Sequence, residues 1–384
     1  NVRGIRVVKS FNQEDHAIKK FKGISQSIYE DFAAGERLLA FNSPIMQFFM
    51  YACMILISWI GAKAVVASGN SAALGMTTGD LTALFSYATQ ILMALMMLSM
   101  VFAMITISLA SAHRIAEVLE EKTDIANPTG AEMTVRDGSI RFEHVNFSYA
   151  AKADKKVLSD IDLSIASGQT VGIIGGTGSS KSSLVQLIPR LYDVSSGRLL
   201  LGGVDVRKYD LETLRSAVAM VLQKNELFSG TIKENLRWGN EAAGDEEMEE
   251  ACRLACADEF IQGFPDKYDT YIEQGGTNVS GGQKQRLCIA RAILRKPKIL
   301  ILDDSTSAVD TKTDALIRQA FKHELPDTTK IIIAQRISSV MDADQIVVMD
   351  NGRINACGTH EELLANNEIY REVYESQQKG GLEE

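Results

Sequence analysis

The hydrophobic pattern divides the chain into a front part with two long apolar runs and a longer back part with short ones. No charged residue interrupts the run from Leu38 to Ala62 or the run from Leu81 to Ala112. A helix needs about 20 apolar residues to cross a bilayer, so each run is long enough. Core helices of soluble domains seldom extend so far without a charged face. We therefore predict two membrane spans, at about 38–62 and 81–112.

The charges beside the two runs predict an orientation. The segment before the first run is rich in Lys and Arg, whereas the turn-rich segment from Lys63 to Asp80 carries a single Lys. Positive residues favour the cytoplasmic side, so we expect both outer ends in the cytoplasm and the loop outside. This describes a multi-pass protein of the cell membrane. Polar residues in the spans, such as Asn42 and Gln90, suit hydrogen bonds between helices or a bundle interior.

Two helices cannot enclose a path for a solute. Either the chain oligomerises or further spans precede it, and since it starts at Asn1 we expect it to be the C-terminal portion of a longer polypeptide. The second span is rich in methionine, which suits either a permissive binding surface or contact with lipid.

The back part has a different pattern, and it begins after a break at Asn127-Pro128-Thr129-Gly130. Short apolar strands there alternate with helical patterns, which is typical of an α/β domain with a largely parallel sheet. We predict a membrane portion over 1–126, a linker over 127–138 and an α/β domain over 139–384. The predicted strands are Ile140–Val145, Thr170–Ile174, Ala217–Leu222, Ile299–Leu302, Ile331–Ala334 and Gln345–Met349.

A glycine-rich loop between a predicted strand and a predicted helix (Leu184–Leu191) predicts a polyphosphate site, because successive backbone N–H groups and a helix N-terminus attract anions. Lys181 would neutralise the β and γ phosphates, and the Ser182 hydroxyl would bind Mg²⁺. Ser180 stands where the strict motif has Gly, and a positive φ there would cost roughly 1 kcal/mol. The residues expected to bind ATP here are Gly175, Thr177, Gly178, Ser179, Ser180, Lys181, Ser182 and Ser183.

Two acids end the apolar run Ile299–Leu302. Asp303 is expected to hold Mg²⁺, and Asp304 offers a carboxylate that could polarise the attacking water. Phosphoryl transfer depends on positioning and electrostatics more than on covalent chemistry, so two acids at the end of a buried strand suit it.

About twenty residues before these acids lies Asn278-Val279-Ser280-Gly281-Gly282-Gln283, a Ser-Gly-Gly-Gln turn that opens a helix. With the phosphate loop, the acids and the two spans, it makes the chain resemble the ABC exporter family, as a half-transporter with fused transmembrane and nucleotide-binding domains. The resemblance covers essentially the whole chain. Gly4–Phe11 looks like the cytoplasmic start of the family's fifth transmembrane helix, so the spans would be helices five and six, with helices one to four absent. The segment of about 230–294 would be the helical subdomain.

The resemblance implies ATP and Mg²⁺ as ligands and gives further residues a role. Tyr149 would stack on adenine, Gln223 would sense the γ-phosphate and bind the metal with Ser182 and Asp303, and Ser307–Asp310 would be the D-loop. In this family two nucleotide-binding domains close on each other, so that each ATP lies between one phosphate loop and the other signature motif. The signature residues are Ser280, Gly281, Gly282 and Gln283.

Besides Ser180, three further positions depart from the family pattern. Asp304 stands where Glu is usual, Gln335 where His is usual, and Gln274 where many members have Glu; we assign Gln274 no role. A base one methylene too short loses positioning, and an amide can neither share a proton nor carry charge. The expected catalytic residues are Gln223, Asp304 and Gln335. The substitutions at two of them predict an ATP site that hydrolyses slowly, in a chain whose signature motif is intact.

This asymmetry predicts one half of a heterodimeric exporter, whose partner half has the usual Glu and His. A homodimeric exporter of lipid or peptide with a competent Asp304 is the alternative, as is a regulatory half that holds ATP but barely hydrolyses it. The resemblance to multidrug exporters implies a small, amphipathic or hydrophobic substrate.

Net charge and cysteine content indicate which partners and which cysteine chemistry to expect. The net charge of −9 argues against a nucleic-acid partner. The five cysteines form no CxxC pair, so we expect them to be reduced thiols.

Overall fold

The computed structural model describes residues 4–150, 156–304 and 309–380. The chain forms two compact units, Asn1–Lys122 and Thr123–Glu384.

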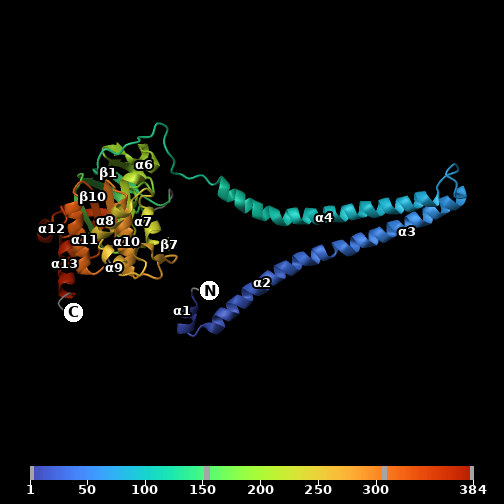
Figure 1. Ribbon diagram of the computed structural model, residues 1–384, viewed down its shortest axis with the longest axis horizontal. Coiled ribbons are helices and arrows are strands. Elements are labelled where there is room, and N and C mark those ends of the chain that lie inside the picture. The colour runs from blue at the N-terminus through green and yellow to red at the C-terminus, as the bar shows by residue number, and fades with distance from the viewer. Residues whose placement is uncertain (1–3, 151–155, 305–308, 381–384) are drawn as a thin grey trace. The chain divides into compact units, whose positions relative to one another are not determined.

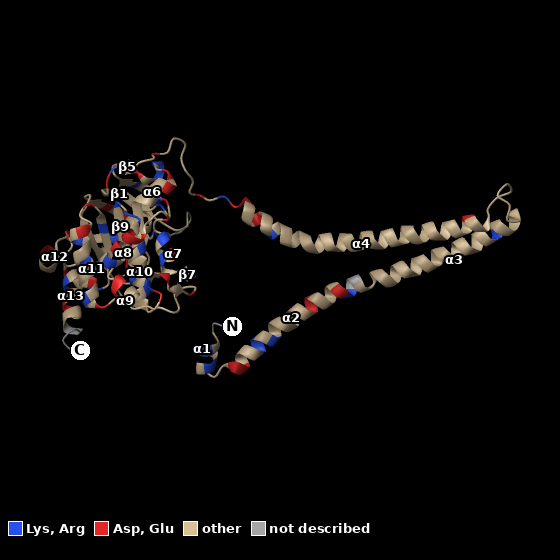
Figure 2. Ribbon diagram, in the orientation of Figure 1, with Lys and Arg blue, Asp and Glu red and all other residues tan. Residues whose placement is uncertain are grey.

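The first unit is helical. Its helices are α1 (Ile5–Ser10), α2 (Glu14–Ala40), α3 (Asn42–Ser68) and α4 (Thr78–Glu120). Helices α3 and α4 lie side by side as a long hairpin (Figure 1). Two helical stretches, Glu14–Ser68 and Thr78–Glu120, are long and apolar enough to cross a membrane, and they contain both predicted spans. Charged residues lie on α2 and at the C-terminal end of α4, and the long middle part of the hairpin has almost no charged residues (Figure 2).

Local sequence signals fix the turn of this hairpin. Gly69 ends α3 in the left-handed conformation that glycine adopts readily, and Thr77 starts α4 with a capping box completed by Asp80. Further along, the Asn42 amide donates a hydrogen bond to the Ser99 hydroxyl at 3.0 Å. Asn42 thus links the two helices, which is one of the two roles expected for polar residues in the spans.

The second unit is built on a six-stranded sheet in the order β12-β11-β3-β10-β9-β6. Five of its strands are parallel and β12 pairs antiparallel with β11, which confirms the prediction of a largely parallel sheet. The bounds are β3 (Thr170–Gly175), β6 (Val218–Val221), β9 (Ile299–Asp303), β10 (Thr329–Ile333), β11 (Gln345–Asp350) and β12 (Arg353–Gly358).

A second sheet is antiparallel, in the order β2-β1-β4-β5, and a short pair β7-β8 lies elsewhere in the unit. The predicted strand at Ile140 belongs to this second sheet, not to the parallel one. Its burial alternates along much of its length, as expected for a strand with one solvent-facing side. The bounds are β1 (Ile140–Phe147), β2 (Leu158–Ile165), β4 (Ser196–Leu201), β5 (Val204–Asp205), β7 (Gly230–Thr231) and β8 (Tyr271–Ile272).

Helices cover the parallel sheet, and α7 to α10 lie in the segment predicted as a helical subdomain (Figure 1). The helix predicted over Leu184–Leu191 is observed as α5, and it starts at Lys181 and ends at Gln186. Pro189 explains the early end, since a proline lacks the N–H that the next turn needs. The helices are α5 (Lys181–Gln186), α6 (Leu211–Ala217), α7 (Ile232–Arg237), α8 (Asp245–Leu254), α9 (Asp258–Gln262), α10 (Gly281–Leu294), α11 (Thr311–Glu324), α12 (His360–Asn366) and α13 (Glu368–Gly380), with 3-10 turns Val206–Lys208, Lys267–Asp269 and Ile337–Ser339.

Strand β9 shows how the core is arranged. Leu300 and Leu302 pack into one hydrophobic cluster, and Ile299 and Ile301 pack into the other. Side chains of a strand alternate between its two faces, so the wholly apolar run buries both faces of the sheet. This burial holds the C-terminal end of β9, and hence the two acids, in a fixed place.

The predicted linker is partly folded into the second unit. Part of the segment predicted as a linker packs onto the second unit: Glu132 pairs with Tyr209, and Val135 is buried.

All five cysteines lie in the described ranges and are free thiols, as predicted. Burial raises the pKa of Cys252 to about 12, so this thiol stays protonated and unreactive at neutral pH.

Candidate nucleotide-binding site

The parallel sheet brings the predicted chemistry to one edge. Strands β3, β10 and β9 are neighbours in register, with Ile333 of β10 opposite both Ile173 and Asp303. Their carboxyl ends therefore present the phosphate loop, the two acids and Gln335 together. They line a cavity of about 530 Å³ whose polar walls are Gly175, Gly176, Thr177, Gly178, Ser180, Lys181, Ser182, Ser183, Gln223, Asp303, Asp304 and Gln335.

The phosphate loop depends on backbone conformations that favour glycine. Gly175 has a φ of 154°, and a Cβ there would lie 2.2 Å from the carbonyl oxygen of Met349. Ser180 has a φ of 72°, which confirms the positive φ considered for this position. The serine is thus held in a left-handed conformation as the residue just before α5.

Replacing Ser180 by Gly is expected to raise the free energy of unfolding by up to about 1 kcal/mol, because relief of the left-handed strain exceeds the extra chain entropy of glycine. Ser180→Ala is the matched control, since Ala retains the strain and removes only the hydroxyl. Denaturant unfolding of both variants measures the difference, and equal stability of the two would contradict the strain argument.

Lys181 lies over the inner side of the loop. Its Nζ donates hydrogen bonds to the carbonyl oxygens of Gly175, at 2.8 Å, and Gly176, at 3.0 Å. Burial lowers the pKa of this ammonium group, while the nearby carboxylates of Asp304 and Asp303 oppose that shift. A polyphosphate in the cavity would favour the charged ammonium further, so Lys181 is suited to the predicted phosphate contact.

Ser182 and Asp303 meet directly. The Ser182 hydroxyl donates to Oδ1 of Asp303 at 2.9 Å. Burial raises the pKa of Asp303, which the negative Asp304 raises further and the Ser182 hydrogen bond lowers. With the amide oxygen of Gln223 in the same cavity, these are the oxygen donors that Mg²⁺ prefers, and a cation would offset the buried charge. The residues present therefore fit a magnesium ion.

Replacing Asp303 by Asn is expected to stabilise the ligand-free protein at pH 7. A raised pKa means that protonation of Asp303 stabilises the fold at low pH and that this contribution is lost as pH rises through the raised value. The advantage of the Asn variant should therefore shrink as pH falls towards 4. Thermal unfolding with and without Mg²⁺ and ATP measures both effects, and the variant should gain much less from the ligands than the parent protein does.

Asp304 occupies an unusual position. It is 8% exposed, has a φ of 49°, and its backbone N–H bonds to the carbonyl oxygen of Ile333 at 3.0 Å. Its Oδ2 accepts hydrogen bonds from the side-chain amides of Gln335, at 2.5 Å, and Gln223, at 3.2 Å. The structure thus joins the three residues of the predicted catalytic set through one carboxylate oxygen.

The predicted signature motif starts helix α10. The hydroxyl oxygen of Ser280 accepts from the backbone N–H of Gln283 at 3.2 Å, and the Ser280 N–H bonds to the Gln283 side chain at 3.0 Å. This capping box orients the helix N-terminus and leaves the hydroxyl proton of Ser280 able to donate. Ser280 and Gly281 are exposed, and the described lining of the cavity does not include them. The motif therefore lies at an exposed helix N-terminus, apart from the described lining of this cavity.

Tyr149 lies beside the phosphate loop. Its hydroxyl is 2.9 Å from the hydroxyl of Ser183, and its ring makes edge contacts with Phe147 and Tyr192. Tyr149 as a residue remains 55% exposed and could receive a flat base, although it does not belong to the described lining of the cavity. Tyr192 is an aromatic neighbour that the sequence did not single out.

Two further points compare the structure with the predicted site. Ser307 and Ala308 of the predicted D-loop lie outside the described residues, whereas Asp310 caps helix α11 through the N–H of Thr313 at 2.9 Å.

Ile369 and Val373 of α13 line the cavity. No motif marks that helix, because it lies next to the site only in the folded domain.

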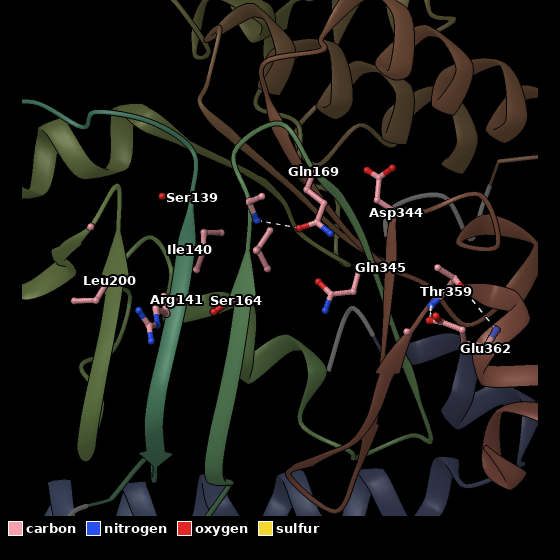
Figure 3. A pocket seen from close by; sticks show the side chains of 14 residues that line it. Ser139, Ile140, Arg141, Ser164, Gln169, Leu200, Asp344, Gln345, Thr359 and Glu362 are labelled. Carbon is pink, nitrogen blue, oxygen red and sulfur yellow. Dashed lines mark hydrogen bonds between the residues drawn. The ribbon is translucent and has the colours of Figure 1, made fainter. Parts of the chain in front are cut away.

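A larger cavity, of about 780 Å³, lies between the antiparallel sheet and α12 (Figure 3). Several of its polar groups already bond within the domain: Gln169 accepts from the N–H of Ala166, Asp344 from that of Thr170, and Glu362 from that of Thr359. It contains none of the residues predicted to bind a phosphate. Most of the residues predicted to bind phosphate, and all of those predicted to bind Mg²⁺, line the smaller cavity instead.

Comparison with known families matches each part of the chain. Residues 158–307 match the ABC transporter family, and residues 1–96 match the ABC transporter transmembrane region. A bacterial Atm1-family ABC exporter solved with ATP bound is similar in structure, with a TM-score of 0.85 and 30% identity over 98% of this chain and 65% of that one.

Curated relatives give the same family. The uncharacterized ABC transporter ATP-binding protein YfiB of Bacillus subtilis is 39% identical over 98% of this chain and 64% of its own length. The fatty acid ABC transporter ATP-binding/permease protein of Mycobacterium bovis is 37% identical over 96% of this chain and 57% of its own length. The chain thus spans a little under two thirds of the relatives it matches.

Proposed function

Since the chain belongs to the ABC transporter family, with part of a transmembrane region and an ATP-binding domain in one polypeptide, we propose that it is half of an ATP-driven heterodimeric exporter. Its own phosphate loop would form a slow ATP site. Its signature motif would complete a faster site on a different partner half. The helical unit (Asn1–Lys122) would lie in the cell membrane as part of a multi-pass domain, with the ATP-binding domain in the cytoplasm.

The observation that carries this proposal is the contrast between Asp304 and the signature motif. Oδ2 of Asp304 is occupied by the amides of Gln335 and Gln223. Both amides donate, so they stabilise the carboxylate without offering it a group that can exchange a proton. The signature motif, by contrast, keeps the residues of its family and presents them at an exposed helix N-terminus.

Within this chain's own site the residues would divide the work as follows. The loop from Gly175 to Ser183 and the start of α5 would cradle the phosphates, and Lys181 would neutralise them. Ser182, Asp303 and the Gln223 oxygen would hold Mg²⁺, which when bound neutralises negative charge on the phosphates. Asp304 would orient the attacking water only weakly, because its short side chain is drawn towards two amide donors.

On the partner's site the chain would act through α10. The N-terminus of this 14-residue helix carries a partial positive charge, and Ser280 adds a hydroxyl donor. Together they form an anion cradle that needs no charged side chain. ATP held by the partner's phosphate loop would bind there when the two domains close.

The transported substrate is proposed to be hydrophobic or amphipathic. The helical hairpin exposes large apolar side chains, among them Phe102 at 72% and Trp59 at 64%. A relative named as a fatty acid transporter supports a substrate of this class. A homodimeric exporter of lipid or peptide is the second candidate, and the retained carboxylate at Asp304 is the observation that favours it.

The native mass of the full-length protein, extracted gently from its own membrane, tests the proposal. Two different subunits in equal number would support the heterodimer. A homodimer that hydrolyses ATP would mean that Asp304 is a working base and would overturn the proposed asymmetry.

A further inference from the structure

The C-terminal helix α13 reaches back to the segment that carries Gln335. We name residues 335–339, which include the 3-10 turn Ile337–Ser339, the switch segment. The side chain of Gln377 on α13 bonds to its main chain twice: Oε1 accepts from the N–H of Ile337 at 2.8 Å, and Nε2 donates to the carbonyl oxygen of Gln335 at 2.8 Å. One amide thus holds the backbone on both sides of Arg336.

These two bonds have a structural reason. Ile337 is 1% exposed, and a buried backbone N–H needs an acceptor because leaving it unpaired is costly. The turn that follows is closed by its own bonds, from Ser339 to Arg336 and from Val340 to Ile337. Gln377 therefore fixes the start of the turn, where the segment leaves the sheet.

Helix α13 is itself held firmly by α12 and so can serve as a fixed support. Tyr370 is fully buried, and its hydroxyl lies 2.6 Å from Nδ1 of His360. Arg371 donates to the carbonyl oxygens of Leu364 and Ala365. The same helix places Ile369 and Val373 in the wall of the nucleotide cavity.

A chain of contacts leads from α13 to the catalytic carboxylate. Gln377 holds the main chain of Gln335, and the side chain of Gln335 donates to Oδ2 of Asp304. We propose that Gln377 is a positioning residue, which keeps the amide of Gln335 on Oδ2 of Asp304, the carboxylate that in the proposed function faces the water attacking the terminal phosphate. Through it, α13 sets how strongly this site prefers ATP to ADP. The inference rests on the proposed function in that the cavity binds ATP.

The test compares Gln377→Ala and Gln377→Glu with the control Gln378→Ala. Gln378 is the next residue on α13, and its side chain bonds to Tyr374 of the same helix at 3.1 Å rather than to the switch segment. In the full-length complex, 8-azido-ATP labels the nucleotide sites, and the subunits are then separated. Competition by AMP-PNP and by ADP, with Mg²⁺, gives both affinities for this chain's site.

Gln377→Ala should weaken AMP-PNP binding by about three- to tenfold, the equivalent of one or two lost hydrogen bonds, and change ADP binding by less than about twofold. Gln378→Ala should match the parent protein. Gln377→Glu keeps the acceptor for Ile337 but sets a carboxylate against the Gln335 carbonyl oxygen. It should therefore preserve slow hydrogen exchange at the Ile337 amide and still lose preference for AMP-PNP.

The outcomes separate the two ideas. If the parent chain takes no label from 8-azido-ATP, both the proposed ATP site and this inference fall. If the parent is labelled and Gln377→Ala binds both nucleotides as the parent does, only the positioning role is overturned. An equal loss of AMP-PNP and ADP also overturns it, because that result marks general damage to the domain. Thermal unfolding of Gln377→Ala and Gln378→Ala shows whether both variants are folded.

Discussion

Replacing Gly281 by Asp is expected to lower ATP turnover of the full-length complex by about a hundredfold, the scale seen when one donor to a developing negative charge is lost. Gly281 is the first residue of α10 and is exposed. In the proposed heterodimer, a carboxylate there would oppose the phosphates of the partner's ATP and cancel the attraction of the helix N-terminus. Gly281→Ala is the matched control, since it adds a side chain without a charge and should retain much more activity.

Lys181→Ala, which damages this chain's own site, should behave differently. It removes the only cation in the described lining of the cavity, so ATP binding at this site should weaken. If the proposed heterodimer is correct, much of the turnover of the complex should survive, because the partner's phosphate loop is untouched. Steady-state ATP hydrolysis by the two variants, prepared side by side, measures the contrast. Equal losses in Gly281→Asp and Lys181→Ala would show that the two sites contribute alike.

The second prediction is an increase in ATP hydrolysis at this chain's own site. Combining Asp304→Glu with Gln335→His is expected to raise hydrolysis at this chain's site by about ten- to a hundredfold, the range that a displacement of about 1 Å of a catalytic group can produce. Glu extends the carboxylate by one methylene towards the cavity. His replaces an amide donor with a ring that can share a proton and carry a positive charge.

The measurement needs a complex in which the partner's own base has been removed, so that turnover at this site is not masked. Each single substitution serves as a control. Asp304→Glu alone should gain less than the pair, because the amide of Gln335, which donates to Oδ2 of Asp304 in the parent protein, would remain in place and could not share a proton. A parent site that already turns over as fast as the double variant would mean that Asp304 is an adequate base, and it would favour the homodimeric alternative.

Much of the candidate site could be predicted because its residues lie in contiguous stretches. The phosphate loop, the acids after β9 and the turn before α10 each carry their chemistry within a few residues, and a strand followed by glycines and a helix has few other meanings. The sequence predicts a strand at Ile140 but not the separate antiparallel sheet to which it belongs, and it does not predict β2, β4 or β5. Half-exposed antiparallel strands mix polar and apolar residues, so their pattern is weak.

Other features have no local signal. Two amides come from distant points of the chain to meet on Oδ2 of Asp304, from Gln223 on one side and Gln335 on the other. Gln377 is one of two adjacent glutamines in a polar helix, and only one of them reaches the switch segment. Which of them does so depends on the rotation of α13, and the burial of Tyr370 sets that rotation.

The sequence by itself therefore determined the kind of protein: two apolar runs that are long enough to span a bilayer, a phosphate loop, two acids and a signature turn, together with the substitutions at 304 and 335. Each of these is a property of neighbouring residues, set by side-chain chemistry and backbone preference. Only the tertiary structure decided how the substituted carboxylate is held and that the C-terminal helix supports the switch segment. Those contacts join residues far apart in the chain, and only the packing of the parallel sheet and its helices brings them within hydrogen-bonding distance.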